Sequence, residues 1–170
     1  WDRCRDTFLQ AQWVPGSAMT RTMKHLERRS ICVYCASDAG SDVAYTETAI
    51  RLGHAIAEAG LGLVYGGGAN GLMGSVARAA FEKGGQVTGI IPDSLREIGS
   101  GLHFVSTIRH VSGYHERKAL MCEISDAFVA LPGGPGTLEE VIEQIAWASS
   151  GLHTKPVFLI NVRGYWNPLE

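Results

Sequence analysis

The sequence has no long apolar run, few cysteines and no excess of charge of one sign. No stretch of its 170 residues approaches the roughly 20 consecutive apolar residues that a membrane-spanning helix requires. The first residues, Trp1 to Cys4, lack the apolar centre of a secretory signal peptide. We therefore expect a soluble, intracellular protein and place it in the cytoplasm.

The charges nearly cancel. The chain carries 15 Lys and Arg residues against 17 Asp and Glu residues, which leaves a net charge of −2 at pH 7. A protein that binds the phosphate backbone of a nucleic acid usually shows a basic face or a strongly basic domain. Neither nucleic acid nor a membrane surface is expected as a partner.

The four cysteines are too few and too scattered for a disulfide framework in a chain of this length. Cys32 and Cys35 have C-x-x-C spacing inside an apolar run typical of a strand, where positions i and i+3 point to opposite faces. We interpret them as buried structural thiols rather than a redox or zinc pair. The histidines show no H-E-x-x-H or H-x-H spacing, so no metal and no cofactor are expected.

From residue 30 onward, short apolar runs alternate with segments of helical period. The expected strands cover residues 31–35, 61–65, 86–91, 104–111, 127–131 and 156–161. A first helix, closed by Gly60, is expected from the helical period of Ala49, Leu52, Gly53 and Ile56. Further helices are expected over residues 71–83, 112–124 and 137–149, and Ser112 can cap the second of these. Strands that are almost continuously apolar and alternate with helices indicate a parallel sheet covered on both faces.

We therefore predict an α/β fold, a Rossmann-like doubly wound parallel sheet of six or seven strands, formed by one domain over residues 30–170. Residues 1–29 show no sustained period. We interpret them as an amino-terminal arm outside the fold, either a targeting remnant, residues left from expression or a flexible extension.

A first glycine-rich loop, Gly66 to Gly71, matches G-x-G-x-x-G, and Asp93 follows about 20 residues later, as in a dinucleotide-binding fingerprint. The match is weak alone, because Asp93 lies past the next strand and the loop follows the second strand instead of the first. The alternative is a tight strand-to-helix turn whose glycines need positive φ. No G-K-[ST] occurs, so a P-loop is excluded.

A second loop, Pro132 to Thr137, follows the fifth expected strand and is called the glycine loop below. Its glycines leave backbone N–H groups unshielded, and the next helix adds the positive end of its dipole, so the loop suits a phosphate ester. Thr137 to Glu140 also fits a capping box, with Glu140 at N3. The expected apolar face of this helix comprises Leu138, Val141, Ile142 and Ile145. At least one of Glu139 and Glu140 should then project toward the loop.

The segment His115 to Ala119 begins the preceding helix. A solvated helix turn is one interpretation, but neither Arg117 nor Lys118 has an opposite charge four residues away with which to pair. If the fourth and fifth strands are neighbours, these cations, the glycine loop and the glutamates meet in one cleft at the carboxyl edge of the sheet. Such a cleft suits an anionic sugar phosphate whose reacting centre develops positive charge.

At these residues the chain resembles the LONELY GUY family of cytokinin riboside 5′-monophosphate phosphoribohydrolases, formerly labelled possible lysine decarboxylases. The resemblance covers residues 31–167 and rests on the segments VYGGGANGLMG, GIIPDSL, HERKA, ALPGGPGTLEE and KPVFLINVRGYWN. It implies hydrolysis of the N-glycosidic bond of N6-substituted adenosine 5′-monophosphates (N6-substituted AMP), which releases a cytokinin base and ribose 5-phosphate. It also implies a homodimer with active sites near the subunit interface.

The resemblance assigns roles to individual residues. Arg117 and Glu140 match the pair considered essential for activity. The substrate-binding residues expected here are Glu97, Lys118, Gly133, Gly134, Gly136, Thr137 and Glu139, together with Gly67 and Gly68 of the first loop.

Two other functions stay open on the same fold, since fold alone does not decide function. One is an AMP nucleosidase of broad specificity, and the other is a non-catalytic carrier of a nucleotide or of the molybdenum cofactor. Lysine decarboxylation is disfavoured because it needs a lysine that forms a Schiff base with pyridoxal phosphate. Of the four lysines, only Lys118 is expected near the site.

Overall fold

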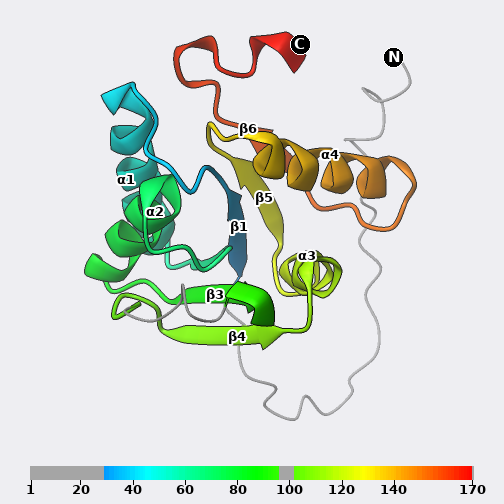
Figure 1. Cartoon of the computed structure of the whole chain (residues 1–170), viewed down its shortest axis with the longest axis horizontal. Helices are drawn as coiled ribbons and strands as arrows, with labels where there is room; N and C mark the ends of the chain where they lie inside the picture. The colour runs from blue at the N-terminus through cyan, green and yellow to red at the C-terminus, as the bar shows by residue number, and fades with distance from the viewer. Residues whose placement is uncertain (1–28, 96–101, 170) are drawn as a thin grey trace, which may run out of the picture.

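The structure is a computed structural model that describes residues 29–95 and 102–169 (Figure 1). Nearly all of the expected amino-terminal arm lies outside the described residues. Glu97, one of the expected substrate-binding residues, lies outside them as well. Their predicted roles stay predictions.

One six-stranded parallel sheet forms the centre of the fold, with the strand order β4-β3-β2-β1-β5-β6. The strands are β1 (Ser30–Tyr34), β2 (Gly62–Tyr65), β3 (Val87–Pro92), β4 (Thr107–Val111), β5 (Ala127–Ala130) and β6 (Val157–Leu159). The helices are α1 (Val43–Glu58), α2 (Gly71–Glu82), α3 (Tyr114–Glu123) and α4 (Pro135–Ser149), and two short 3-10 turns, η4 (Val162–Gly164) and η5 (Asn167–Leu169), follow β6. The predicted Rossmann-like parallel sheet is confirmed, with six strands.

The sheet is doubly wound. Helices α1 and α2 pack together on one face, and α3 and α4 lie on the other (Figure 1). The chain first adds strands on one side of β1 and then returns to add β5 and β6 on the other side. Because parallel crossovers are right-handed, this reversal moves the helices to the opposite face. The switch point therefore lies between the carboxyl ends of β1 and β5, where such sheets bind ligands.

Each face of the sheet has its own core, because successive residues of a strand point to opposite faces. The core under α1 and α2 contains Val33 and Cys35, and the core under α3 and α4 contains Cys32, Tyr34 and Phe128. Cys32 and Cys35 are both buried and free. The prediction of structural thiols on opposite faces is confirmed.

Three loops are held together at the carboxyl edge of the sheet. The Ala36 N–H donates to the Pro132 carbonyl at 3.1 Å, and the Met73 N–H donates to the Ala36 carbonyl at 3.2 Å. Gly71 has a φ of 59°, and a Cβ there would lie 2.3 Å from the carbonyl carbon of Ser37. Only glycine allows so close an approach, which brings the loops after β1, β2 and β5 into one region.

The fourth and fifth strands are not neighbours, so that expectation is wrong. β4 is an edge strand, and β3, β2 and β1 separate it from β5. The connection from β4 to β5 must therefore cross the sheet, and α3 makes this crossing while contacting β3 and β4. α3 starts at the carboxyl end of β4, and from its first turn the long side chain of Arg117 reaches Gly66 at the end of β2 and Glu140 of α4.

The start of α3 also differs from the prediction. Gly113, not Ser112, is the N-cap residue. Ser112 instead donates from its N–H and its Oγ to the Glu116 carboxylate, at 2.8 and 2.6 Å. These two hydrogen bonds lower the pKa of Glu116. Ser112 therefore lies one residue before the observed N-cap, and the expectation that it caps this helix is wrong.

Candidate active site

The glycine loop leads directly into α4. Gly134 is the N-cap residue, Pro135 occupies the first helical turn, and no side chain caps the helix. Proline is favoured at this position because its fixed φ suits a helix and no N–H is needed there. The expected capping box is therefore wrong: the helix begins before Thr137, and Glu140 makes its contact with another helix.

The first turn of α4 has the features of an anion site. The first N–H groups of a helix have no carbonyl within the helix to bind, and Pro135 contributes none, so Gly136 and Thr137 carry the donors of this turn. Thr137 is buried and packs against Gly133, where an added Cβ would lie 2.1 Å from Thr137 Oγ1. Gly133 is thus required by close packing, and the loop backbone stays open to a ligand.

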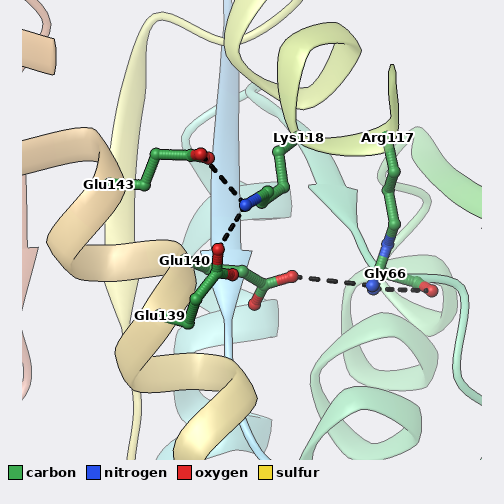
Figure 2. Close-up of polar contacts among 6 residues, drawn as sticks. All are labelled: Gly66, Arg117, Lys118, Glu139, Glu140 and Glu143. Carbon is green, nitrogen blue, oxygen red and sulfur yellow. Dashed lines mark hydrogen bonds and ion pairs between the residues drawn. The ribbon is translucent and has the colours of Figure 1, made fainter. Parts of the chain in front are cut away.

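Arg117 of α3 reaches across to the end of β2 (Figure 2). Its NH2 group donates to the Gly66 carbonyl at 3.2 Å, and its NH1 group lies 3.6 Å from Glu140 Oε1. A Cβ on Gly66 would lie 1.9 Å from the guanidinium, so glycine is needed there. Gly66 was not among the site residues predicted from the sequence, whereas its neighbours Gly67 and Gly68 were.

The Arg117 guanidinium is largely enclosed but not fully bonded. The residue is 8% exposed, and among the described residues its Nε–H has no hydrogen-bond partner. Buried donors of this kind normally have a partner. Within the described chain the contacts of the guanidinium are therefore made by NH1 and NH2, and the Nε–H is left unsatisfied.

Glu140 is a carboxylate in an unusual environment. Burial raises its pKa from the ordinary 4.5 to about 7, although the nearby Arg117 cation lowers it and Glu139 raises it. A carboxyl group that titrates near neutral pH can both accept and donate a proton under physiological conditions. Perturbed groups of this kind are concentrated at functional sites.

Lys118 lies between two carboxylates of α4 (Figure 2). Its Nζ forms a short contact with Glu139 and a 3.0 Å contact with Glu143. Burial alone would lower the pKa of Lys118, but the hydrogen bonds to the two glutamates outweigh burial and raise it. Glu143 was missed in the sequence, although it lies four residues after Glu139 and so on the same side of the helix.

Arg117, Glu140 and the first turn of α4 line a cavity of about 350 Å³, which is within the range of small-molecule sites. Lys118, Glu139 and Gly133 are not among the residues that bound it. It is bounded by Cys35, Ala36, Ser37, Asp38, Met73, Arg117, Gly134, Pro135, Gly136, Thr137 and Glu140. Ser37 and Asp38, in the loop after β1, were not singled out in the sequence. Within residues 29–95 and 102–169, no group of three His, Cys, Asp or Glu side chains could hold a metal ion.

The first glycine-rich loop behaves as a strand-to-helix turn. Gly67 has a φ of 76°, and a Cβ there would lie 2.4 Å from Ile91. Conformation and packing therefore account for this glycine. Gly67 and Gly68 are not among the residues that bound the cavity, and their part in substrate binding stays a prediction.

The apolar face predicted for α4 is only partly right. Val141 is buried, and so are Thr137 and Gln144 on the same side of the helix. Leu138, Ile142 and Ile145 are instead 37%, 48% and 40% exposed. They form an apolar stripe on the outside of the described chain, because Val141 and its neighbours already face the sheet.

Comparison with known proteins places these features in a family. The family model described as "Possible lysine decarboxylase" matches residues 73–170. The chain is 51% identical over 148 residues to cytokinin riboside 5′-monophosphate phosphoribohydrolase LOG of Oryza sativa subsp. japonica, covering 84% of this chain and 60% of the relative. It is 47% identical over 148 residues to LOG3 of Arabidopsis thaliana, covering 87% of this chain and 69% of the relative. The chain thus spans about two thirds or less of the length of these relatives.

Solved structures with the same fold include carriers of the molybdenum cofactor. The molybdenum cofactor carrier protein of Chlamydomonas reinhardtii matches with a TM-score of 0.64 and 26% identity over 84% of this chain and 85% of its own. The molybdenum cofactor binding protein of Rippkaea orientalis matches with a TM-score of 0.63 and 26% identity over 78% of this chain and 76% of its own. Proteins described as phosphoribohydrolases and as cofactor carriers are thus both similar to this chain.

Proposed function

The chain belongs to the LONELY GUY family of cytokinin riboside 5′-monophosphate phosphoribohydrolases, and from this we propose that it hydrolyses the N-glycosidic bond of N6-substituted AMP. The products are a free cytokinin base and ribose 5-phosphate. The observation that carries the proposal is the Arg117 to Glu140 contact of 3.6 Å beside the glycine loop. Through this contact, a carboxylate with a raised pKa and the anion site at the start of α4 border the same cavity.

The substrate phosphate is assigned to the glycine loop. Gly133, Gly134, Gly136 and Thr137 would hold it through backbone N–H groups and the positive end of α4. Lys118 and Glu139 would contribute to substrate binding. Lys118 already contacts Glu139 and Glu143, so one of the three N–H donors of its ammonium group remains for a substrate.

Glu140 is assigned to the reacting carbon. Breaking the bond between C1′ of ribose and N9 of the purine creates a centre that resembles an oxocarbenium ion. A nearby carboxylate stabilises this positive charge and polarises the attacking water. A pKa of about 7 suits a group that accepts a proton from that water near neutral pH.

Arg117 is assigned to the nucleotide and its leaving base. Its guanidinium stays charged at all relevant pH values and offers several donors in a fixed plane. Arg117 borders the same cavity as Glu140, and its NH1 group faces that carboxylate, so the guanidinium is placed to contact the substrate. Its charge would also offset the negative charge that builds on the departing purine.

The test measures base release from isopentenyladenosine 5′-monophosphate, AMP and the unphosphorylated riboside, followed by chromatography. We expect isopentenyladenine from the monophosphate alone, and Arg117→Ala and Glu140→Gln should each remove turnover without unfolding the domain. Faster release of adenine from AMP would make the protein a broad nucleosidase. Binding of the nucleotide without any release would favour a carrier, as in the molybdenum cofactor proteins of the same fold.

We also propose that the protein is a homodimer. The exposed stripe of Leu138, Ile142 and Ile145 borders the glycine loop, and apolar patches of this kind mark protein contacts. A second copy that covers this stripe would place the active sites near the interface. Ile142→Glu should convert the dimer to a monomer in sedimentation velocity, whereas a parent chain that sediments as a monomer would refute the proposal.

The cytoplasm is the proposed site of action. Cys32, Cys35 and Cys122 are free thiols in the described part of the chain, as is usual for proteins of reducing compartments. None of the described helices is long and apolar enough to span a bilayer. Fractionation of cells that produce the protein tests this assignment.

A further inference from the structure

The segment after β6 returns to the glycine loop through one hydrogen bond. Tyr165, which follows η4, donates from its hydroxyl group to the Gly133 carbonyl at 2.7 Å. Its ring packs edge-on against Tyr45, with centroids 5.7 Å apart, and against Trp166, with centroids 5.0 Å apart. The rings on either side restrict the tyrosine, so its hydroxyl group is held at the carbonyl.

This hydrogen bond acts on a peptide group of the anion site. The described chain contains no cis peptide bond, so the Gly133 carbonyl and the Gly134 N–H share one plane and point in opposite directions. Gly134 bounds the cavity that contains Arg117 and Glu140, whereas Tyr165 does not. With its carbonyl held by Tyr165, this peptide group therefore turns its N–H away from Tyr165.

The peptide needs such a restraint because it joins two glycines. Glycine rotates its backbone at little steric cost, so an unrestrained Gly133–Gly134 peptide could turn its N–H away from the ligand. Pro135 has no N–H to replace it. The packing of Thr137 against Gly133 holds the Cα atom, but it does not by itself orient the peptide plane.

We propose that Tyr165 is a positioning residue for phosphate recognition. It locks the Gly133–Gly134 peptide with the Gly134 N–H directed at the 5′-phosphate, and it thereby sets the preference for phosphorylated over unphosphorylated ribosides. The identity of the substrate rests on the proposed function, but the lock itself concerns only the binding of a sugar phosphate.

Tyr165→Phe tests the lock by removing a single oxygen. A hydrogen bond of this kind contributes about a fivefold change in an equilibrium constant. The KM for isopentenyladenosine 5′-monophosphate should rise about fivefold. The kcat should not change, since Arg117 and Glu140 are untouched. Any turnover of the riboside should also stay the same, because the riboside has no phosphate. Tyr45→Phe is the matched control, because it removes a hydroxyl group from the neighbouring ring and leaves the bond to Gly133 in place.

Calorimetry with ribose 5-phosphate separates this proposal from the proposed function. About fivefold weaker binding to Tyr165→Phe than to the parent and to Tyr45→Phe supports the lock, even if the parent hydrolyses no nucleotide. Equal binding to all three proteins would overturn it, and so would a parent chain that does not bind ribose 5-phosphate. A fall in kcat at constant KM in Tyr165→Phe would show a general packing role instead. Equal losses of ribose 5-phosphate binding in Tyr165→Phe and Tyr45→Phe would show the same.

Discussion

Replacing Glu140 by glutamine should abolish hydrolysis and at the same time stabilise the folded protein at alkaline pH. The side chain is only 13% exposed, and burial raises its pKa from 4.5 to about 7 even though Arg117 lies 3.6 Å away. The folded protein therefore disfavours the ionised carboxylate that the reaction needs. Glutamine resembles the neutral form and removes this cost.

The size of the effect follows from the pKa difference. Below about pH 4.5 the carboxyl group is protonated in the folded and unfolded chains alike, so it has no such cost. As the pH rises to about 7, the unfolded chain ionises first and the free energy of unfolding falls. Above that pH the loss is complete, and its size is on the order of 3 kcal/mol.

The assay is urea denaturation of the parent and of Glu140→Gln at about pH 5 and about pH 8. The variant should be the more stable protein at the higher pH, with a much smaller difference at the lower pH. Glu47→Gln, the same change at an exposed position of α1, is the control and should not alter the pH dependence. If Glu140→Gln is the less stable protein at the higher pH, the ion pair with Arg117 outweighs burial and the reasoning is refuted.

Three further outcomes are expected. The kcat/KM should rise with pH through about 7 as Glu140 ionises, and a flat profile over that range would exclude it as the base. Gly133→Ala should raise the KM for the monophosphate, because its Cβ would lie 2.1 Å from Thr137 Oγ1. Gly136→Ala should keep its melting temperature, because the added Cβ meets open space. Equal loss of stability in both would contradict the steric argument. Lys118→Met should lower the free energy of unfolding by about 2 kcal/mol in urea denaturation, because it leaves two α4 carboxylates without their cation. An unchanged free energy of unfolding would mean that these contacts are not stabilising.

Local pattern predicted most of the fold because each strand is a short apolar run and each helix has its own period. The same pattern could not predict which side of α4 faces the sheet. Leu138, Ile142 and Ile145 are as apolar as Val141, yet only Val141 is buried. Periodicity reports which residues avoid water, but not whether the sheet or another surface covers them.

The candidate site shows the same limit. The motifs around Arg117 and Glu140 are visible in the sequence, but the expected route to their contact, through neighbouring strands, was wrong. The contact depends on α3 crossing the sheet. Gly66 and Tyr165 were missed because their partners lie 51 and 32 residues away in the chain.

The sequence by itself determined the alternation of strands and helices, the parallel sheet, the buried thiols and the two glycine-rich loops, since these depend on composition and on spacing within short segments. Only the tertiary structure decided the strand order, the start of α4 at Pro135, the two carboxylates around Lys118 and the raised pKa of Glu140. The physical reason is that burial and ion pairing depend on groups far apart in the chain. The carboxyl group of Glu140 titrates near neutral pH because the fold encloses it, and no property of the segment LPGGPGTLEE specifies that enclosure.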